Sequence, residues 1–179
     1  MRKVPAEGRA LRSNGEGRWA IERIVSGGQT GVDRAALDAA LSLEIPCGGW
    51  CPRGRRAEDG PIPARYPLRE TPTARYSERT EWNVRDSDGT LVLHRGRLGR
   101  GTQLTLRMAA ASARPLLVLD LSESPDPAQV GRWAIARGVR VLNVAGPRES
   151  DAPGLHGEAA RFLTEALGPA RGATAGDAS

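Results

Sequence analysis

Two glycine-rich segments of the sequence have a composition that suits the binding of an anion. The first reads Gly27-Gly28-Gln29-Thr30-Gly31 and follows an apolar run at 21–26, and the second spans 96–102 after an apolar run at 90–93. A helix is expected to begin directly after each. The N–H groups at a helix start lie at the positive end of its dipole, where they bind phosphate or another oxyanion. The predicted contacts are Gly27, Gly28, Gln29, Thr30, Gly31, Gly99, Gly101 and Thr102.

Neither segment matches a standard nucleotide-binding fingerprint. The first lacks the Lys-Ser/Thr pair of a P-loop, and the second has the order G-x-x-G-x-G rather than G-x-G-x-x-G. A tight turn that needs glycine at positive φ is the alternative explanation for one such segment. Two of them at strand ends of one parallel sheet favour anion binding, because ligands of such sheets bind beyond the carboxyl ends of the strands.

Arginine side chains near these segments could neutralise a bound anion. Arg34 lies in the first expected helix, where it could equally point to solvent, and Arg148 follows the last expected strand. A guanidinium in the second position can clamp an oxyanion with two hydrogen bonds. Asn143, at the end of that strand, is a further candidate, although its amide could instead satisfy backbone groups. Asp33 is expected to interact with the helix dipole or to cap the helix rather than to catalyse.

The segment 51–67 contains four prolines and several charges, and it is expected to be a long loop that covers the ligand. Its three arginines stand close in sequence to Glu58 and Asp59, so pairing among these side chains is the alternative to a role in binding; the arginines are Arg53, Arg55 and Arg56.

The histidines and cysteines do not form a pattern typical of catalysis or of a metal site. His94 and His156 are far apart in sequence, and Cys47 and Cys51 have C-x3-C spacing, which is weak evidence for metal without two further ligands. We expect both cysteines to pack as reduced thiols in a cytoplasmic protein. No catalytic residue and no metal ligand is assigned.

Short apolar runs alternate with amphipathic segments between residues 21 and 167, which predicts an α/β fold with a parallel sheet flanked by helices. The expected strands are 21–26, 45–50, 68–70, 90–93, 115–120 and 139–144. The expected helices are 32–43, 77–86, 127–137 and 155–167, together with one that opens at 96–102 and continues to 112. Ser77 is the expected N-cap of the helix at 77–86. A length of 179 residues indicates a single domain at 21–168, with a flexible leader at 1–20 and a disordered tail at 169–179.

The location of the charge decides what the pI of about 10.2 means. The first twenty residues carry +3 of the net charge of +5 and the last eleven are neutral, so the body carries only +2, which argues against a nucleic-acid partner. One stretch, between Asp88 and Asp120, holds five arginines and no acid, and a positive potential is expected there. No apolar run is long enough to cross a membrane.

Four blocks of the sequence resemble the family known as putative molybdenum carriers. They read IVSGGQTGVDRAALD at 24–38, GWCPRGRRAEDG at 49–60, YSERTEWNV at 76–84 and LNVAGPRES at 142–150. That family is similar to a circularly permuted branch of the SLOG superfamily, which includes LOG-type nucleotide hydrolases. The resemblance implies a Rossmann-like sheet, a homo-oligomer and the binding of molybdenum cofactor, a pterin that carries a phosphate and a dithiolene-held oxo-metal.

The residues Gly99-Arg100-Gly101-Thr102 resemble part of the P-G-G-x-G-T-x-x-E loop of LOG enzymes, with one departure. The position of the catalytic glutamate of those enzymes is Thr105, and a neutral hydroxyl is a poor acid or base for glycosidic cleavage. We therefore expect a carrier that binds a small anionic ligand, either molybdenum cofactor or an unknown nucleotide-like molecule. The alternative is a nucleoside monophosphate hydrolase, with Glu58 or Asp59 as a relocated acid, or a nucleotide-sensing domain.

Overall fold

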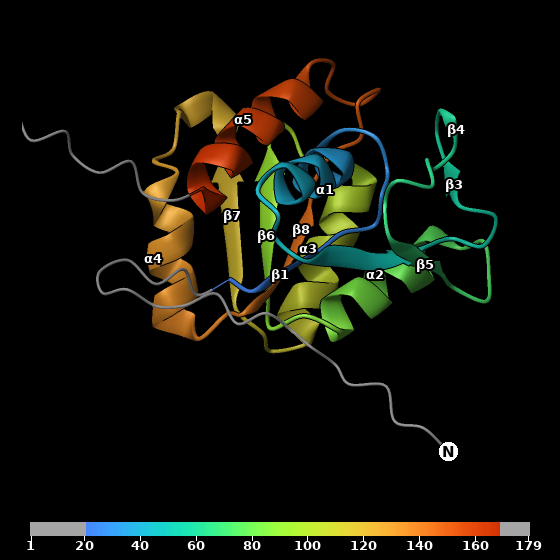
Figure 1. Cartoon of the computed structure of the whole chain (residues 1–179), viewed down its shortest axis with the longest axis horizontal. Helices are drawn as coiled ribbons and strands as arrows, with labels where there is room; N and C mark the ends of the chain where they lie inside the picture. The colour runs from blue at the N-terminus through green and yellow to red at the C-terminus, as the bar shows by residue number, and fades with distance from the viewer. Residues whose placement is uncertain (1–20, 169–179) are drawn as a thin grey trace, which may run out of the picture.

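The computed structural model describes residues 21–168, and the leader and tail expected from the sequence lie outside them (Figure 1). The elements follow in the order β1 (Arg23–Val25), α1 (Val32–Ser42), β2 (Cys47–Cys51), β3 (Arg56–Ala57), β4 (Gly60–Pro61), β5 (Leu68–Glu70), α2 (Tyr76–Arg85), β6 (Gly89–His94), α3 (Arg100–Ala111), β7 (Leu116–Asp120), a 3-10 turn (Leu121–Glu123), α4 (Ala128–Arg137), β8 (Val141–Ala145) and α5 (Leu155–Leu167).

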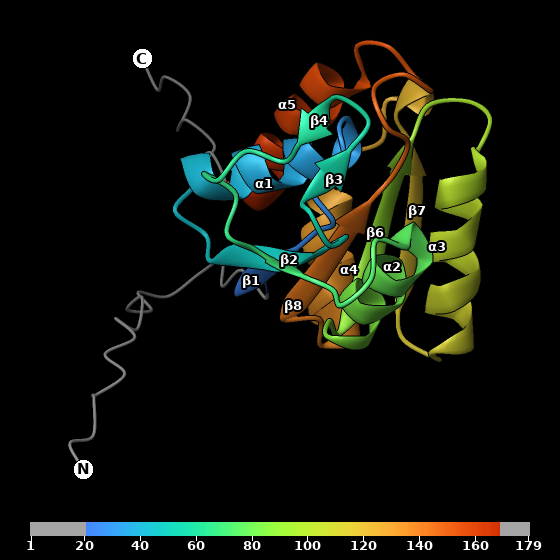
Figure 2. The same cartoon turned by 90° about the vertical axis from the view of Figure 1, so that its right-hand side faces the viewer.

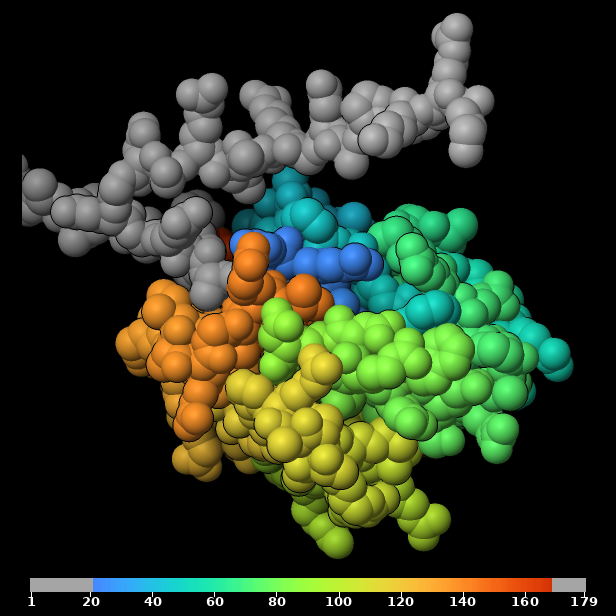
Figure 3. All heavy atoms as spheres, turned by 90° about the horizontal axis from the view of Figure 1, so that it is seen from below, coloured from blue at the N-terminus to red at the C-terminus, as the bar shows by residue number. Residues whose placement is uncertain are grey.

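Six of the strands form one parallel sheet in the order β5-β2-β1-β8-β6-β7, and β3 and β4 form a separate hairpin. Helix α5 packs against both α1 and α4, and α2 packs with α3. In Figure 2, α3 lies to one side of β6 and β7 while α1 and α5 lie to the other. Figure 3, seen from below, shows the segments that contain α2 and α3 side by side. The single-domain, Rossmann-like α/β fold is thus confirmed.

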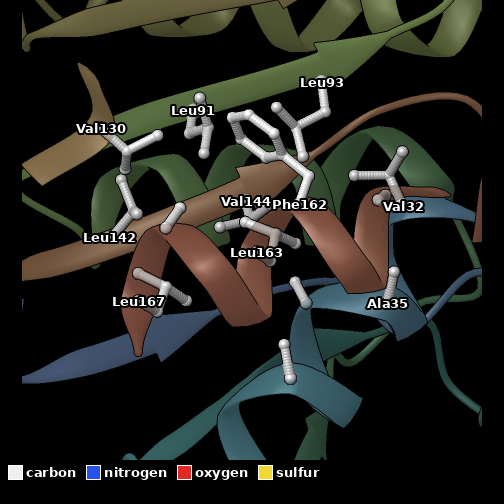
Figure 4. Packing of buried hydrophobic residues seen from close by; sticks show 14 of the residues in the cluster. Val32, Ala35, Leu91, Leu93, Val130, Leu142, Val144, Phe162, Leu163 and Leu167 are labelled. Carbon is white, nitrogen blue, oxygen red and sulfur yellow. The ribbon is translucent and has the colours of Figure 1, made fainter. Parts of the chain in front are cut away.

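The packing of α1 against α5 depends on the small residues of α1. Ala35, Ala36, Ala39 and Ala40 are buried, at the spacing expected from the sequence, so the two helix backbones approach closely. Figure 4 shows Phe162 and Leu163 of α5 directed at the strand residues Leu91, Leu142 and Val144. The apolar faces of β6, β8 and α5 therefore form one core.

The start of α2 differs from the sequence expectation. Ser77 was predicted as the N-cap, but the helix begins at Tyr76, with Arg75 in the capping position and no side-chain cap. The carboxylate of Glu78 accepts hydrogen bonds from the backbone N–H and the hydroxyl of Thr73. The preceding turn is therefore tied to the first turn of the helix.

Two glycines bring the loops at the carboxyl ends of the central strands together. A Cβ on Gly146, just after β8, would collide with the carbonyl of Leu93 and with the side chain of Val32. A Cβ on Gly31, which has φ of 74°, would collide with the backbone of the 147–149 segment. The loops that follow β1 and β8 and the end of β6 are thus in close backbone contact, which no larger residue would allow.

We expect Gly146→Ala to destabilise the protein by about 1–3 kcal/mol, since the added methyl group must displace backbone atoms. Gly157→Ala is the matched control. Gly157 lies in α5 with open space around its Cα, so alanine there should stabilise the protein by about 0.5–1 kcal/mol. Denaturant unfolding of the two variants measures both effects, and equal stability of the two would contradict the close approach.

Candidate functional site

The carboxyl ends of the central strands carry a cleft of about 470 Å³, a volume in the range of small-molecule sites. Its walls are the loop between β1 and α1, the first turns of α2 and α3, and the loop between β8 and α5. The lining residues are Gln29, Asp33, Tyr76, Arg79, Thr80, Gly99, Arg100, Gly101, Thr102, Leu104, Thr105, Ala145, Gly146, Pro147, Arg148 and Asp151. Three arginines and two aspartates are among them.

The amino end of α3 opens into this cleft. Gly99 occupies the N-cap position without a side-chain cap, and the first turn contains no acid. The first bond that closes the helix runs from the N–H of Gln103 to the carbonyl of Gly99, at 3.0 Å. The amides of the three residues before Gln103 therefore have no carbonyl partner within the helix. The space beside Gly101 is open, since a Cβ there would meet no atom within 4 Å.

The amino end of α1 is occupied by the protein itself. The N–H of Gln29 donates to the carboxylate of Asp33 at 3.3 Å, and the N–H of Thr30 donates to the side-chain oxygen of Gln29 at 3.0 Å. The N–H of Val32 donates to the carbonyl of Pro147 at 3.2 Å. Three amides that a ligand could have used are thus paired within the protein.

The glycines of the first segment have packing reasons of their own. A Cβ on Gly28, at φ of 75°, would collide with the side chain of Leu68, and one on Gly27 would collide with the guanidinium of Arg79. Only Gln29 of the segment 27–31 lines the cleft. Anion binding by this segment therefore stays a prediction, and its geometry matches the tight-turn alternative.

A third helix, α5, also begins at this end of the sheet, and its amino end is capped. The carboxylate of Glu149 accepts hydrogen bonds from the N–H groups of Gly154 and His156. Of α1, α3 and α5, α3 is thus the helix whose amino end the described residues leave uncapped toward the cleft.

A buried ion pair forms one wall of the cleft. Arg79 of α2 donates from Nη1 to Asp33 Oδ2 of α1 at 2.8 Å, and the side chain of Asp33 is only 3% exposed. Burial raises the pKa of the Asp33 carboxyl, while Arg79 acts in the opposite direction. The absence of a side chain at Gly27 makes room for this guanidinium.

The two arginines predicted from the sequence have different surroundings. Arg148 lines the cleft, with its Nε 3.3 Å from Glu58 and 3.2 Å from Asp151. Arg34 points away from it: the guanidinium donates to Asp59 at 2.6 and 2.7 Å, and its Nε donates to the carbonyl of Gly28 at 3.1 Å. Arg148 can reach a ligand in the cleft, whereas Arg34 fixes the β3–β4 hairpin.

The segment 51–67 is fastened to the loops around the cleft through Glu58. Its carboxylate accepts hydrogen bonds from Thr30, from the backbone N–H of Ser150 at 3.1 Å and from the Ser150 hydroxyl. Desolvation favours the protonated form, but the hydrogen bonds from Ser150 and Thr30 outweigh it and lower the pKa of Glu58. The same balance, led by the hydrogen bonds from Arg34, lowers the pKa of Asp59.

Pairing within the segment 51–67, one alternative from the sequence, is wrong for both acids. Glu58 bonds to Ser150 in another loop and Asp59 bonds to Arg34 of α1, as described above. Arg55 donates instead to the backbone carbonyls of Ile62, Pro63, Tyr66 and Leu68. These bonds hold the turns of the segment in place without an acid.

Asn143, the remaining candidate, lies outside the cleft lining. It is buried in β8 and donates to the hydroxyl of Thr90 at 3.3 Å. The structural role considered for it in the sequence analysis fits this position, in which its amide joins two neighbouring strands of the sheet.

The histidines and cysteines have partners or packing environments away from the cleft. His156 Nε2 lies 3.0 Å from Asp38, and His94 Nδ1 lies 2.9 Å from the carbonyl of Gly96. Cys51 is buried in a small apolar cluster and Cys47 packs beside it; burial raises the pKa of both thiols. Within residues 21–168, no group of three His, Cys, Asp or Glu residues could hold a metal ion.

Comparison with known proteins places the chain in a family. Residues 24–167 match the model of the circularly permutated YpsA SLOG family. A solved structure of a protein from Syntrophus aciditrophicus named "Putative molybdenum carrier protein" is 44% identical, with a TM-score of 0.78; the match covers 83% of this chain and 95% of that one. No curated protein matches. The chain therefore belongs to the circularly permutated YpsA SLOG family, as its sequence blocks predicted.

We expect Glu58→Gln to lower the melting temperature near neutral pH, because the charged carboxylate holds Thr30 and Ser150. A lowered pKa means that this stabilisation is present above the ordinary value of 4.5 and is lost as the pH falls through the lower value of the folded protein. The difference between wild type and variant should therefore shrink below that pH. Glu81→Gln, on the exposed face of α2, is the control for melting curves recorded from neutral to acidic pH. A pH-independent difference would contradict the assignment.

Proposed function

We propose that this protein binds a phosphate-bearing, planar anionic ligand in the cleft and carries it without a covalent step. The observation that carries the proposal is the uncapped amino end of α3, which opens into the cleft beside Arg100. Amides at a helix start and a nearby guanidinium both favour an oxyanion. Arg148, on the opposite loop, supplies a second guanidinium.

Molybdenum cofactor is the ligand that we propose first. The name of the 44% identical relative refers to molybdenum carriage, and the cofactor combines a phosphate with a flat pterin. The amides of the 99–102 segment would hold the phosphate, and the remaining length of the cleft would hold the ring system. The metal is cargo held by the dithiolene of the cofactor, so the protein need not supply metal ligands. A cytoplasmic homo-oligomer remains part of the proposal.

The position of Thr105 supports carriage over hydrolysis. Thr105 lines the cleft, and its hydroxyl donates to the carbonyl of Gly101 at 3.3 Å. A neutral hydroxyl with this partner is a poor stabiliser of the positive charge that develops on a sugar when its base departs. The relocated acids considered from the sequence, Glu58 and Asp59, hold loops together and do not line the cleft.

One observation favours the alternative, a nucleoside monophosphate hydrolase. Two carboxylates, Asp33 and Asp151, line the cleft. Asp33 is already engaged by Arg79, and Asp151 by Arg148, so each would have to act from within an ion pair. The alternative is distinguished by turnover, because a carrier needs none.

We expect Arg100→Glu to weaken the binding of a nucleoside monophosphate by about tenfold or more, since charge-assisted hydrogen bonds to phosphate are lost and an acid is placed at the helix start. Arg107→Glu is the matched control, because it makes the same charge change on α3 outside the cleft. Isothermal titration calorimetry of both variants measures the affinities. Equal affinity of the two variants would remove the amino end of α3 from the site.

We expect wild-type protein to release base from nucleoside monophosphates very slowly or not at all. Free base is followed by chromatography over a panel of monophosphates, with Thr105→Glu as the comparison. Robust turnover by wild type that disappears in Asp33→Asn or Asp151→Asn would support the hydrolase and contradict the carrier proposal.

A further inference from the structure

The wall of the cleft formed by α2 is a second surface that could contact a ligand. It differs from the amino end of α3 because it combines an aromatic ring with an arginine whose charge is compensated. Tyr76, Arg79 and Thr80 all line the cleft, and their spacing of i, i+3 and i+4 places them on one face of the helix. None of the three was expected from the sequence as a site residue.

Arg79 has hydrogen-bond donors that the protein does not use. Its hydrogen bond to Asp33 uses Nη1, and its Nε is buried with no acceptor among residues 21–168. The side chain remains 15% exposed. A guanidinium carries five N–H donors, and among the described residues one of them is used, in the hydrogen bond to Asp33.

The charge of Arg79 is already balanced by Asp33, so this position is not suited to an additional phosphate. Asp33 acts as a positioning residue: its carboxylate holds the guanidinium, and Gly27 leaves the space in which the guanidinium lies. What Arg79 still offers is a set of oriented donors, with its net charge compensated. The chemical group that fits such donors is a neutral acceptor such as a ring carbonyl.

Tyr76 offers a flat apolar surface next to these donors. Tyr76 is 40% exposed although it lines the cleft, and Leu104 of α3 lines the same cleft. A planar heterocycle gains stacking and apolar contact from such a pair of side chains. The face of α2 thus combines a surface for a ring with donors for the edge of that ring.

We infer that Arg79 donates hydrogen bonds to a ring carbonyl of the bound heterocycle, while the amides at the amino end of α3 bind the phosphate. The ligand class is a phosphorylated oxo-heterocycle, which includes 6-oxopurine nucleotides and 4-oxopteridine phosphates. The inference rests on the proposed function, because it assumes that the phosphate lies at α3. Adenine is disfavoured, since its 6-amino group would direct a donor at the donors of Arg79.

The test compares purine nucleotides that differ at one ring position, with the full-length protein and isothermal titration calorimetry. The ligands are inosine, purine-riboside and adenosine 5′-monophosphates, which carry a carbonyl, a hydrogen and an amino group at position 6. We expect inosine monophosphate to bind about tenfold or more tightly than adenosine monophosphate, with purine-riboside monophosphate between them. This comparison needs no variant, so a folding defect cannot obscure it.

Arg79→Lys tests the residue directly, because lysine keeps the charge beside Asp33 but loses the planar set of donors. The preference for inosine monophosphate should fall to about twofold or less. Arg34→Lys is the matched control, since Arg34 is also paired with an aspartate but lies outside the cleft lining, and it should keep the preference. The affinities of guanosine monophosphate and of a phosphorylated pterin are then compared, to decide whether the ligand is a 6-oxopurine nucleotide or a 4-oxopteridine phosphate.

Two results would overturn the inference, and they differ in what they say of the proposed function. If inosine and adenosine monophosphates bind wild type equally well, and Arg100→Glu weakens both, Arg79 does not read the ring and the phosphate site stands. If the three purine nucleotides, guanosine monophosphate and the phosphorylated pterin all fail to bind, the proposed function and the inference fall together.

Discussion

Backbone contact among the loops that follow β1 and β8 and the end of β6 is the constraint on which the cleft depends. Gly146 permits the approach to the end of β6, and Gly31 permits the approach to the 147–149 segment. With side chains at these positions the loops after β1 and β8 would separate, and they would no longer enclose one volume with the first turns of α2 and α3. The same contacts supply the carbonyl of Pro147 that occupies an amide of α1.

The amino ends of α1, α3 and α5 differ in whether the protein itself pairs their amides. At α1 and α5, acceptors of the protein itself pair the amides, so these ends stabilise the fold. At α3 the flanking residue is a glycine and the first turn has no acid, in keeping with the acid-free stretch between Asp88 and Asp120. Of these three helix starts, the one at α3 therefore keeps the positive end of its dipole uncompensated toward the cleft.

Much of the fold could be predicted from the sequence, because the period of the apolar residues reports locally on strands and helices, as with the alanines of α1. The role of the 99–102 segment as a cleft wall was also accessible, since a glycine turn before a helix is a local signal. Arg79 was not, because its partner Asp33 lies 46 residues away and only the folded chain joins them. The same holds for Arg34, whose partner Asp59 comes from a hairpin that sequence periodicity did not predict.

The fastening of the 51–67 segment by Glu58 and Asp59 has a consequence for the thermodynamics of ligand capture. A lid that closes on a ligand loses backbone freedom at that moment, and the lost entropy is subtracted from the affinity. Here that ordering has already taken place during folding, because the hairpin is held by Thr30, Arg34 and Ser150. No residue of the segment 51–67 lines the cleft, so a ligand that enters the cleft has no cost of ordering this segment to offset and loses mainly its own translational and rotational freedom.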